Sequence, residues 1–287
     1  MSTNETQMQV SLMNAADTLM SNYENGTAAK AVKPVAKIFV AAIMAGMFIA
    51  FGGSSSNVAV FGIENVGLAR TLAGCIFPVG LMLIVLVGGE LFTGNCMMIG
   101  GVMTGRIKAM QMIRVLVTVY LGNLVGSLIV SFLAYYSGQW KYGAGALGAY
   151  TIKVAFGKLN LSFGTAVASG ILCNILVCVA VLMASASKDA VGKIFGCFFP
   201  IWAFVIAGYE HCVANMYYIP AGIIAAMDPA FAQKAMELYG YTAEDLAMLN
   251  PVNMIVNNLI PVTIGNIIGG MLFVAVPYVY LYNKKAK

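Results

Sequence analysis

Charged side chains are scarce in this sequence of 287 residues. Asp, Glu, Lys and Arg make up 9% of it, and apolar residue types make up 60%. A soluble domain has about a quarter of its residues charged, because its surface must face water. This chain has too few charges for such a surface, so most of its surface is expected to face the lipid bilayer. No nucleic acid is expected among its partners.

Residues that bind metals or form disulfides are also few. His211 is the only histidine, and the six cysteines lack the paired spacing of a metal site. Every cysteine lies in an apolar segment, whereas disulfides normally tie exposed loops together in an oxidising compartment. The sequence therefore predicts free thiols and neither a metal nor a cofactor. With one histidine, no carboxylate cluster and no cofactor motif, it also argues against an enzyme.

Long runs without charge are abundant. A helix needs about 20 residues to cross a bilayer. Six stretches reach or approach that length: residues 38–63, 71–89, 115–140, 159–187, 194–209 and 246–283. Alternating ten-residue segments, which are typical of membrane β-barrels, are absent. The pattern predicts an all-α integral membrane protein with six transmembrane helices.

Basic residues indicate the orientation of the spans, because loops rich in Lys and Arg stay on the cytoplasmic side. One set of span ends carries Lys30, Lys33, Lys37, Arg106, Lys108, Arg114, Lys188, Lys193, Lys284, Lys285 and Lys287. The other set carries Arg70, Lys141, Lys153, Lys158 and Lys234. The richer set should be cytoplasmic, and it includes both termini, which agrees with an even number of spans. We expect a multi-pass protein of the cell inner (plasma) membrane.

The amino-terminal residues 1–26 are polar and carry several acidic side chains. A secretory signal would begin with basic residues and an apolar stretch, so no cleaved signal is expected. Apolar residues recur in this segment at helical spacing: Met8, Leu12, Ala16, Leu19 and Tyr23. The spacing predicts a short amphipathic helix along the membrane surface, with a frayed polar tail as the alternative.

The two halves of the chain resemble each other. A glutamate precedes an asparagine by five positions in each half, as Glu90 and Asn95 and again as Glu210 and Asn215. Residues 122–127 are echoed later by residues 265–270, and both stretches begin with Gly-Asn. Each half then holds three spans, so the second half enters the membrane from the opposite side. Such inverted repeats occur in channels and transporters whose sites lie near the midplane.

Glycines interrupt the second and fifth spans at matching places. Gly88 and Gly89 precede the first glutamate, and Gly208 lies just before the second. Glycine weakens a helix and adopts backbone angles that other residues avoid. Backbone N–H groups lose their partners at such breaks and can face an anion, helped by the positive end of the following half-helix. We therefore predict broken second and fifth helices around a substrate site.

Two polar side chains lie at these breaks. An ionisable ring at membrane depth is costly, so His211 is interpreted as a donor of a hydrogen bond or a proton to a passing anion. A neutral histidine bonded to the neighbouring backbone is the alternative. The Thr93 hydroxyl either bonds the substrate or His211, or it bonds its own helix carbonyl.

Other polar residues have structural interpretations. Glu90 and Glu210 would repel an anion, so each is expected to cap free N–H groups at a break or to bond a neighbouring helix. Lys158 either draws anions to the mouth of a path or is an ordinary interfacial lysine. Asn123 and Asn266 are expected to bond across helices at the breaks, with a pore-lining role as the alternative.

Two further features concern packing and loops. Glycines of the third and sixth spans have the small-residue spacing of close helix packing, either between subunits or within one. Residues 228–251 are expected to form an external loop with short helical turns, one of them capped by residues 242–245.

Four ordered motifs together carry a resemblance to a known family. They are residues 88–95 (GGELFTGN), 170–174 (GILCN), 208–216 (GYEHCVANM) and 258–266 (NLIPVTIGN). Nearly all of the chain after the amino-terminal segment resembles the formate–nitrite transporter family. The resemblance implies an aquaporin-like six-helix fold, a homopentamer with one pore in each subunit, and transport of formate, nitrite, hydrosulfide or similar small anions.

The same resemblance implies roles for individual residues. His211 matches the central pore histidine and Thr93 its partner. The other polar positions implied for the pore are Glu210, Asn174, Asn266 and Lys158. The residues implied for the apolar constrictions are Phe77, Leu81, Leu91 and Phe204. Leu91 and Phe204 are expected to share one constriction.

The expected function is a channel or transporter for small monovalent anions, chiefly formate, with pH-dependent and proton-linked permeation. Nitrite or hydrosulfide is the alternative substrate. A neutral-solute channel of aquaporin type is a weaker alternative, because paired Asn-Pro-Ala motifs are missing at the breaks. The expected organisation is an amphipathic cytoplasmic segment (1–31), a six-helix pore domain (32–283, with halves of about 37–140 and 159–283) and a basic cytoplasmic tail (284–287).

Overall fold

Six segments of the described part of the chain are long and apolar enough to cross a membrane. The structure is a computed structural model that describes residues 12–283. The spans are Val35–Val60 (α3), Val66–Val87 (α4, Val66–Ile76, and α5, Val79–Val87), Ala109–Tyr136 (α8), Phe163–Ala186 (α10), Ala190–Ala207 (α11) and Pro251–Tyr282 (from α15, Pro251–Asn253, to α17, Val276–Tyr282). The predicted all-helical membrane protein with six spans is confirmed.

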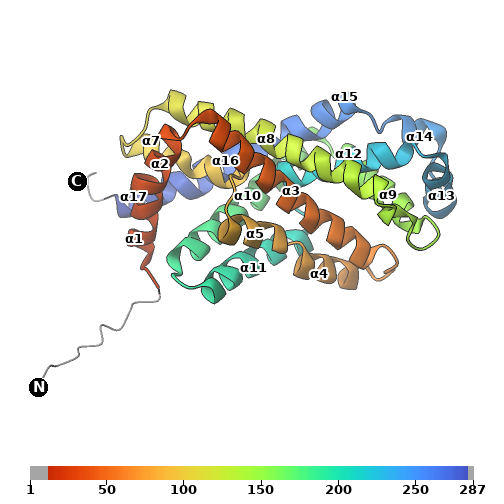
Figure 1. Cartoon of the computed structure of the whole chain (residues 1–287), viewed down its shortest axis with the longest axis horizontal. Coiled ribbons are helices and arrows are strands. Elements are labelled where there is room, and N and C mark those ends of the chain that lie inside the picture. Colours follow the sequence, from red (N-terminus) through yellow and green to blue (C-terminus); the bar gives the residue numbers. More distant parts are fainter. Residues whose placement is uncertain (1–11, 284–287) are drawn as a thin grey trace, which may run out of the picture.

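The helix bundle is elongated and has two distinct ends (Figure 1). One end holds α1 (Ala15–Met20), α2 (Thr27–Val32), α7 (Ile99–Met103) and α17. The opposite end holds α9 (Ala146–Leu159), α13 (Pro229–Tyr239) and α14 (Ala243–Ala247). We call these the terminal end and the α9 end. The first and last helices therefore lie on the same side, as an even number of crossings requires.

Both predicted helix breaks are present. The second span ends with α5, and after residues 88–91 the chain restarts as α6 (Phe92–Asn95) and continues into α7. The fifth span ends with α11, and after residues 208–211 the chain restarts as α12 (Cys212–Ala226). Gly88 has a φ of 104° and Gly208 a φ of 74°, which are backbone angles that glycine adopts without steric cost. The glycines therefore explain where these helices stop.

Close helix packing joins the same pairs of spans in each half. Helix α8 packs on α3, and α16 (Ile260–Gly270) packs on α10. A Cβ atom added at Gly126 of α8 would overlap the carbonyl oxygen of Ile43, and one at Gly269 of α16 would overlap that of Ile171. These glycines thus bring helices together within one chain. The sequence had left open whether they pack helices between subunits or within one.

The α9 end contains a helix that the sequence analysis did not assign. Helix α9 packs against α12 and α13, so it covers this end of the bundle beside the second broken span. The loop predicted at 228–251 does contain short helices, α13 and α14. Thr242 caps α14 in a reciprocal pair of hydrogen bonds with Asp245, as the sequence predicted.

The amino-terminal segment is helical but packs differently from the prediction. Met8 lies outside the described residues, as does the tail 284–287. Leu19 and Tyr23 are 3% and 1% exposed because they pack in a cluster with Val274 and Val279 near the carboxyl end. These two side chains are therefore covered by the protein itself, whereas Leu12 of the same series is 61% exposed.

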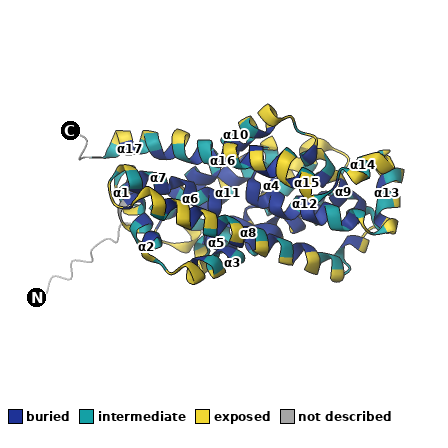
Figure 2. Ribbon diagram, turned by 90° about the horizontal axis from the view of Figure 1, so that it is seen from above, coloured by how far each residue is buried: buried dark blue, intermediate teal, exposed yellow. Residues whose placement is uncertain are grey.

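Exposed residues follow the outward turns of the spans (Figure 2), and many of them are apolar. Examples are Val40, Leu121, Phe132, Leu133, Leu272 and Phe273. Exposed apolar surface of this extent is unfavourable in water and is the surface that lipid or another subunit covers.

We expect Gly126→Ala to destabilise the protein, because its new methyl group would meet the backbone of α3. Overpacking of this kind costs about 1–3 kcal/mol. The matched control is Gly164→Ala in α10, where an added Cβ meets no atom within 4 Å. Thermal unfolding in detergent measures both. Equal melting temperatures for the two variants would show that α3 and α8 do not need this close approach.

Candidate functional site

Three cavities follow one another through the bundle. A cavity of about 230 Å³ opens at the α9 end, and one of about 180 Å³ opens at the terminal end. Between them lies a central cavity of about 10 Å³. Phe77, Phe204 and His211 line both the α9-end cavity and the central cavity. Leu81 and Leu91 line both the central cavity and the terminal-end cavity. The shared side chains show that the three cavities form one path.

Apolar side chains close this path on both sides of the central cavity. The rings of Phe77 and Phe204 meet edge to face, with centroids 5.6 Å apart. Leu81 and Leu91 close the other side. The central cavity is about the size of a single water molecule, so a larger solute passes only when these side chains move.

The expectation that Leu91 and Phe204 share one constriction is wrong. Leu91 borders the terminal-end side of the central cavity, whereas Phe204 borders its α9-end side. The physical reason is that Leu91 belongs to the first break and Phe204 to the last turn of α11, before the second break. Helix α5, which precedes the first break, and helix α11, which precedes the second, approach the middle of the membrane from opposite ends.

His211 is held by the start of helix α12. It is the N-cap residue, and its Nδ1 accepts a hydrogen bond of 3.0 Å from the backbone N–H of Ala214. An acceptor nitrogen carries no hydrogen, so the hydrogen of the neutral ring is on Nε2. Nε2 lies 2.9 Å from Thr93 Oγ1 and therefore donates to it. The histidine of the second break thus meets the threonine that follows the first break.

Thr93 reaches the path only through this bond. Its side chain is fully buried and lines none of the three cavities. His211 is 2% exposed but does line the path. The structure therefore brings these two predicted residues together, and of the two only His211 lines the path.

Two buried asparagines hold the broken helices in place. Asn123 Oδ1 accepts from the N–H of Phe92 at 3.0 Å, and its Nδ2 donates to the carbonyls of Ala42 and Glu90. Backbone groups freed at the first break are therefore satisfied by a side chain from α8. Without such partners, each buried group would cost about 1–3 kcal/mol.

Asn266 repeats this arrangement at the second break. Its Oδ1 accepts from the N–H of Cys212 at 2.9 Å, and its Nδ2 donates to the carbonyls of Gly170 and Glu210. Asn174 donates to the carbonyls of Thr93 and Asn266, which links the two breaks. Asn174 and Asn266 are both fully buried and line none of the three cavities. The structure places them behind the path as its supports.

Each break also carries a glutamate bonded to a lysine and an asparagine. At the α9 end, Glu210 pairs with Lys158 at 2.9 Å and accepts from Asn215 at 2.6 Å. Both glutamates were expected to cap N–H groups or to bond a neighbouring helix. Glu210 bonds a neighbouring helix, because Lys158 comes from α9.

At the terminal end Glu90 also bonds a neighbouring helix, but the sequence did not identify its lysine partner. Glu90 pairs with Lys30 of α2 at 2.9 Å and with Lys33 at 3.4 Å, and it accepts from Asn95 at 3.1 Å. From the sequence, Lys30 was interpreted only as one of the basic residues that indicate the orientation of the spans. The signal was present in the repeated glutamate–asparagine spacing, but the spacing alone does not name the lysine.

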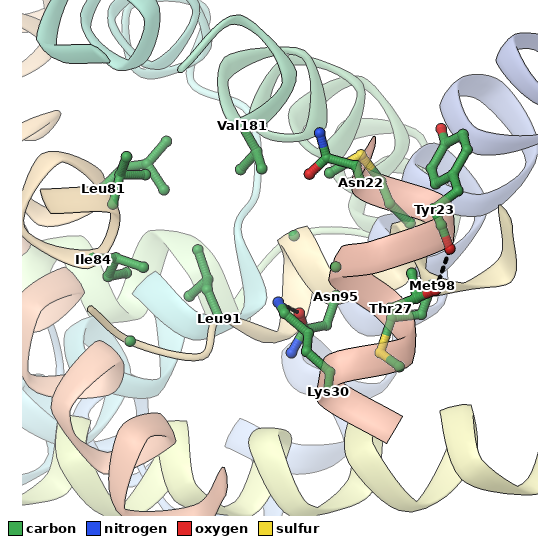
Figure 3. A pocket seen from close by; sticks show the side chains of 15 residues that line it. Asn22, Tyr23, Thr27, Lys30, Leu81, Ile84, Leu91, Asn95, Met98 and Val181 are labelled. Atoms are coloured by element: carbon green, nitrogen blue, oxygen red, sulfur yellow. Dashed lines mark hydrogen bonds between the residues drawn. The ribbon is translucent and has the colours of Figure 1, made fainter. Parts of the chain in front are cut away.

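Helices near the amino terminus lie over the terminal-end cavity. Asn22, Tyr23 and Thr27 line it from one side, and Leu81 and Leu91 lie across from them (Figure 3). Lys30 points into the same space and donates a hydrogen bond to Asn95. The amino-terminal segment is thus part of the path lining.

A six-span bundle with two open cavities, two apolar constrictions and a buried histidine between them has the architecture of a membrane channel for small solutes. The sequence matches the family described as "Formate/nitrite transporter" over residues 17–280. The chain belongs to this family.

Individual relatives agree with this assignment. The chain is 42% identical to a probable formate transporter of Methanothermobacter thermautotrophicus over 271 residues, which cover 88% of this chain and 91% of that protein. It is 36% identical to the formate channel FocA of Escherichia coli over 260 residues, which cover 89% and 90%. A solved pentameric formate channel with formate bound superimposes with a TM-score of 0.76 at 36% identity, covering 87% of this chain and 98% of that one.

The two constrictions generate a prediction about selectivity. Leu91→Ala and Phe204→Ala each widen one side of the central cavity, so each single variant keeps one apolar barrier. Ions cross a dry apolar barrier only at a high dehydration cost. We expect the double variant alone to leak chloride, with a chloride-to-formate flux ratio raised about tenfold or more.

The control for this experiment is Leu147→Ala, which truncates a buried leucine that lines none of the three cavities. It should lower the melting temperature and leave the flux ratio unchanged. If the double variant behaves in the same way as Leu147→Ala, Leu91 and Phe204 are ordinary core residues.

The asparagine supports generate a second prediction, on stability. Asn123→Leu and Asn266→Leu keep the approximate volume but remove the partner of one N–H and of the glutamate carbonyl at each break. We expect each variant to lose about 2 kcal/mol or more of stability. Asn160→Leu is the comparison, since Asn160 is exposed and bonds only its own helix. If unfolding titrations give the same free energy of unfolding for all three variants, the supporting role of Asn123 and Asn266 is refuted.

Proposed function

We propose that this chain conducts small monovalent anions, chiefly formate, through a path in each subunit, and that permeation is linked to protons. One observation carries the proposal: a buried imidazole with its hydrogen on Nε2 lies at the central cavity, between two apolar constrictions. The names of the relatives identified above support formate as the substrate.

The proposed mechanism follows from the cost of dehydration. An isolated carboxylate in an apolar environment is unfavourable by on the order of tens of kcal/mol, so it crosses in neutral form or with a strong donor. Thr93 holds the Nε2–H of His211 in place until a solute arrives, and the ring then turns that donor toward the solute. His211 thereby stabilises the anion between the constrictions by hydrogen bonding. Formate that crosses as the neutral acid takes its proton from the water of the open cavity through which it enters.

Nitrite and hydrosulfide are the alternative substrates. A comparison of formate, nitrite, hydrosulfide and chloride fluxes in a reconstituted bilayer, with and without a proton gradient, separates them. A chain that carries none of these anions would overturn the proposal.

Assembly and orientation belong to the same proposal. The solved relative is pentameric, and the path found here is lined by one chain, so we infer a homopentamer with a path in every subunit. We place the terminal end in the cytoplasm of a cell with this chain in its inner (plasma) membrane. Lys30 and Lys33, with the other basic residues at this end, support that orientation.

Two variants at position 211 separate the structural role of the histidine from its functional role. Asparagine is a good N-cap residue, so His211→Asn keeps the bond to the N–H of Ala214 but loses the donor that reaches Thr93. Phenylalanine loses both. We expect His211→Phe to be destabilised by about 0.5–2 kcal/mol and His211→Asn to retain nearly wild-type stability.

Transport should be altered in both variants, because neither carries the imidazole. We expect each to lose the wild-type dependence of formate flux on pH, measured by uptake into proteoliposomes across a pH series. Wild-type flux and pH dependence in His211→Asn would show that the histidine serves only as a helix cap.

A further inference from the structure

The α9-end cavity contains two basic side chains with different electrostatic surroundings. Lys158 has its ammonium group 2.9 and 3.1 Å from the two carboxylate oxygens of Glu210. Its charge is therefore largely compensated. Arg70 lines the same cavity and is exposed, and no carboxylate in the described part of the chain pairs with it. The uncompensated positive charge of this cavity is thus on Arg70.

Arg70 is fixed at the rim by the end of helix α11. Its Nη1 donates to the carbonyl oxygen of Ile206 at 3.2 Å. Its guanidinium group lies over Gly208, where an added Cβ would overlap Nη1. The glycine that ends α11 therefore also makes room for the guanidinium group. Of the five N–H donors of this group, four remain for a ligand.

An unsatisfied donor lies in the same cavity. Asn57 is 6% exposed, and its Nδ2 has no hydrogen-bond partner among the described residues. Its neighbour Ser56 bonds the carbonyl of Ala73, so α3 contacts α4 one turn beyond Arg70. A buried amide nitrogen without a partner is costly, which points to a ligand that supplies an acceptor. The other unpartnered amide atom of this cavity, Asn215 Oδ1, is itself an acceptor and takes no part in holding an anion.

We propose that Arg70 and Asn57 form a recruitment site that binds a small planar monoanion at the α9 end, before it reaches the constriction of Phe77 and Phe204. This inference rests on the proposed function. A guanidinium fork matches two coplanar oxygens and binds them in parallel. Formate and nitrite present two such oxygens, whereas hydrosulfide and chloride present one atom. The site therefore selects by shape as well as by charge, and the Asn57 amide binds the anion as it moves inward.

The test compares four variants reconstituted in proteoliposomes with formate supplied from the α9 end. Arg70→Gln removes the charge, Arg70→Lys keeps the charge without the fork, and Asn57→Leu removes the inner donor. Lys153→Gln is the matched control, since Lys153 is an exposed lysine of α9 that does not line the cavity. The readouts are the half-saturating concentration and the maximal flux for formate and for hydrosulfide, with melting temperature as the check on folding.

We expect Arg70→Gln to raise the half-saturating formate concentration about tenfold with maximal flux retained, since it removes a charge-assisted bidentate contact. Asn57→Leu should raise it about threefold, and Lys153→Gln should stay within about twofold of wild type. Arg70→Lys should lose the wild-type preference for formate over hydrosulfide. A purely electrostatic or purely structural role of Arg70 would leave the ratio of the two half-saturating concentrations as it is in wild type.

Two results would overturn the recruitment site while leaving the proposed function intact. One is an Arg70→Gln variant that matches Lys153→Gln. The other is a lower maximal flux with an unchanged half-saturating concentration, which would make Arg70 only a cap of α11. If the wild-type chain carries no formate, the proposed function fails, and the recruitment site fails with it.

Discussion

The hydrogen bonding of two interrupted helices is the constraint on which this structure depends. A helix that stops inside a membrane leaves backbone N–H and C=O groups that no water can satisfy. Asn123 and Asn266 solve this problem in the same way in each half, with one acceptor and two donors directed at backbone atoms around a break. Because each asparagine comes from a different helix, the breaks are pinned to the rest of the bundle. The path can exist only because these bonds are made.

The geometry of the path follows from the pinned breaks. Half-helices that enter from opposite ends place Thr93 after one break and His211 at the other, 2.9 Å apart. The same arrangement puts apolar side chains on both sides of this pair. A hydrogen bond from a donor between two dry constrictions is stronger than it would be in water, since no water competes for that donor. In the proposed mechanism, a solute therefore loses its water at the same place where the imidazole can donate a hydrogen bond to it.

The buried charges beside the two breaks are paired in a similar way in each half. The buried carboxylates of Glu90 and Glu210 each bond a lysine and an asparagine, so neither is left unpaired in an apolar environment. This pairing matters for the solute, because the carboxylate of Glu210 compensates the charge of Lys158 and weakens its attraction for an anion. Attraction at the α9 end then falls to a cation that lacks a carboxylate partner, and Arg70 fits that description. Structural lysines and recruiting arginine therefore have separate tasks.

The sequence by itself determined the six spans, the inverted repeat and both breaks, because scarce charge, span length and the glycines at 88 and 208 act locally along the chain. It also singled out His211, since an ionisable residue in an apolar run is visible without coordinates. Only the tertiary structure decided that Asn266 supports the backbone and lies off the path, and that Lys158 is paired with Glu210. It also decided that Leu91 and Phe204 belong to different constrictions. These properties depend on which distant side chain is within hydrogen-bond reach and on which side of a break a residue lies. The spacing of residues along the sequence does not contain this information.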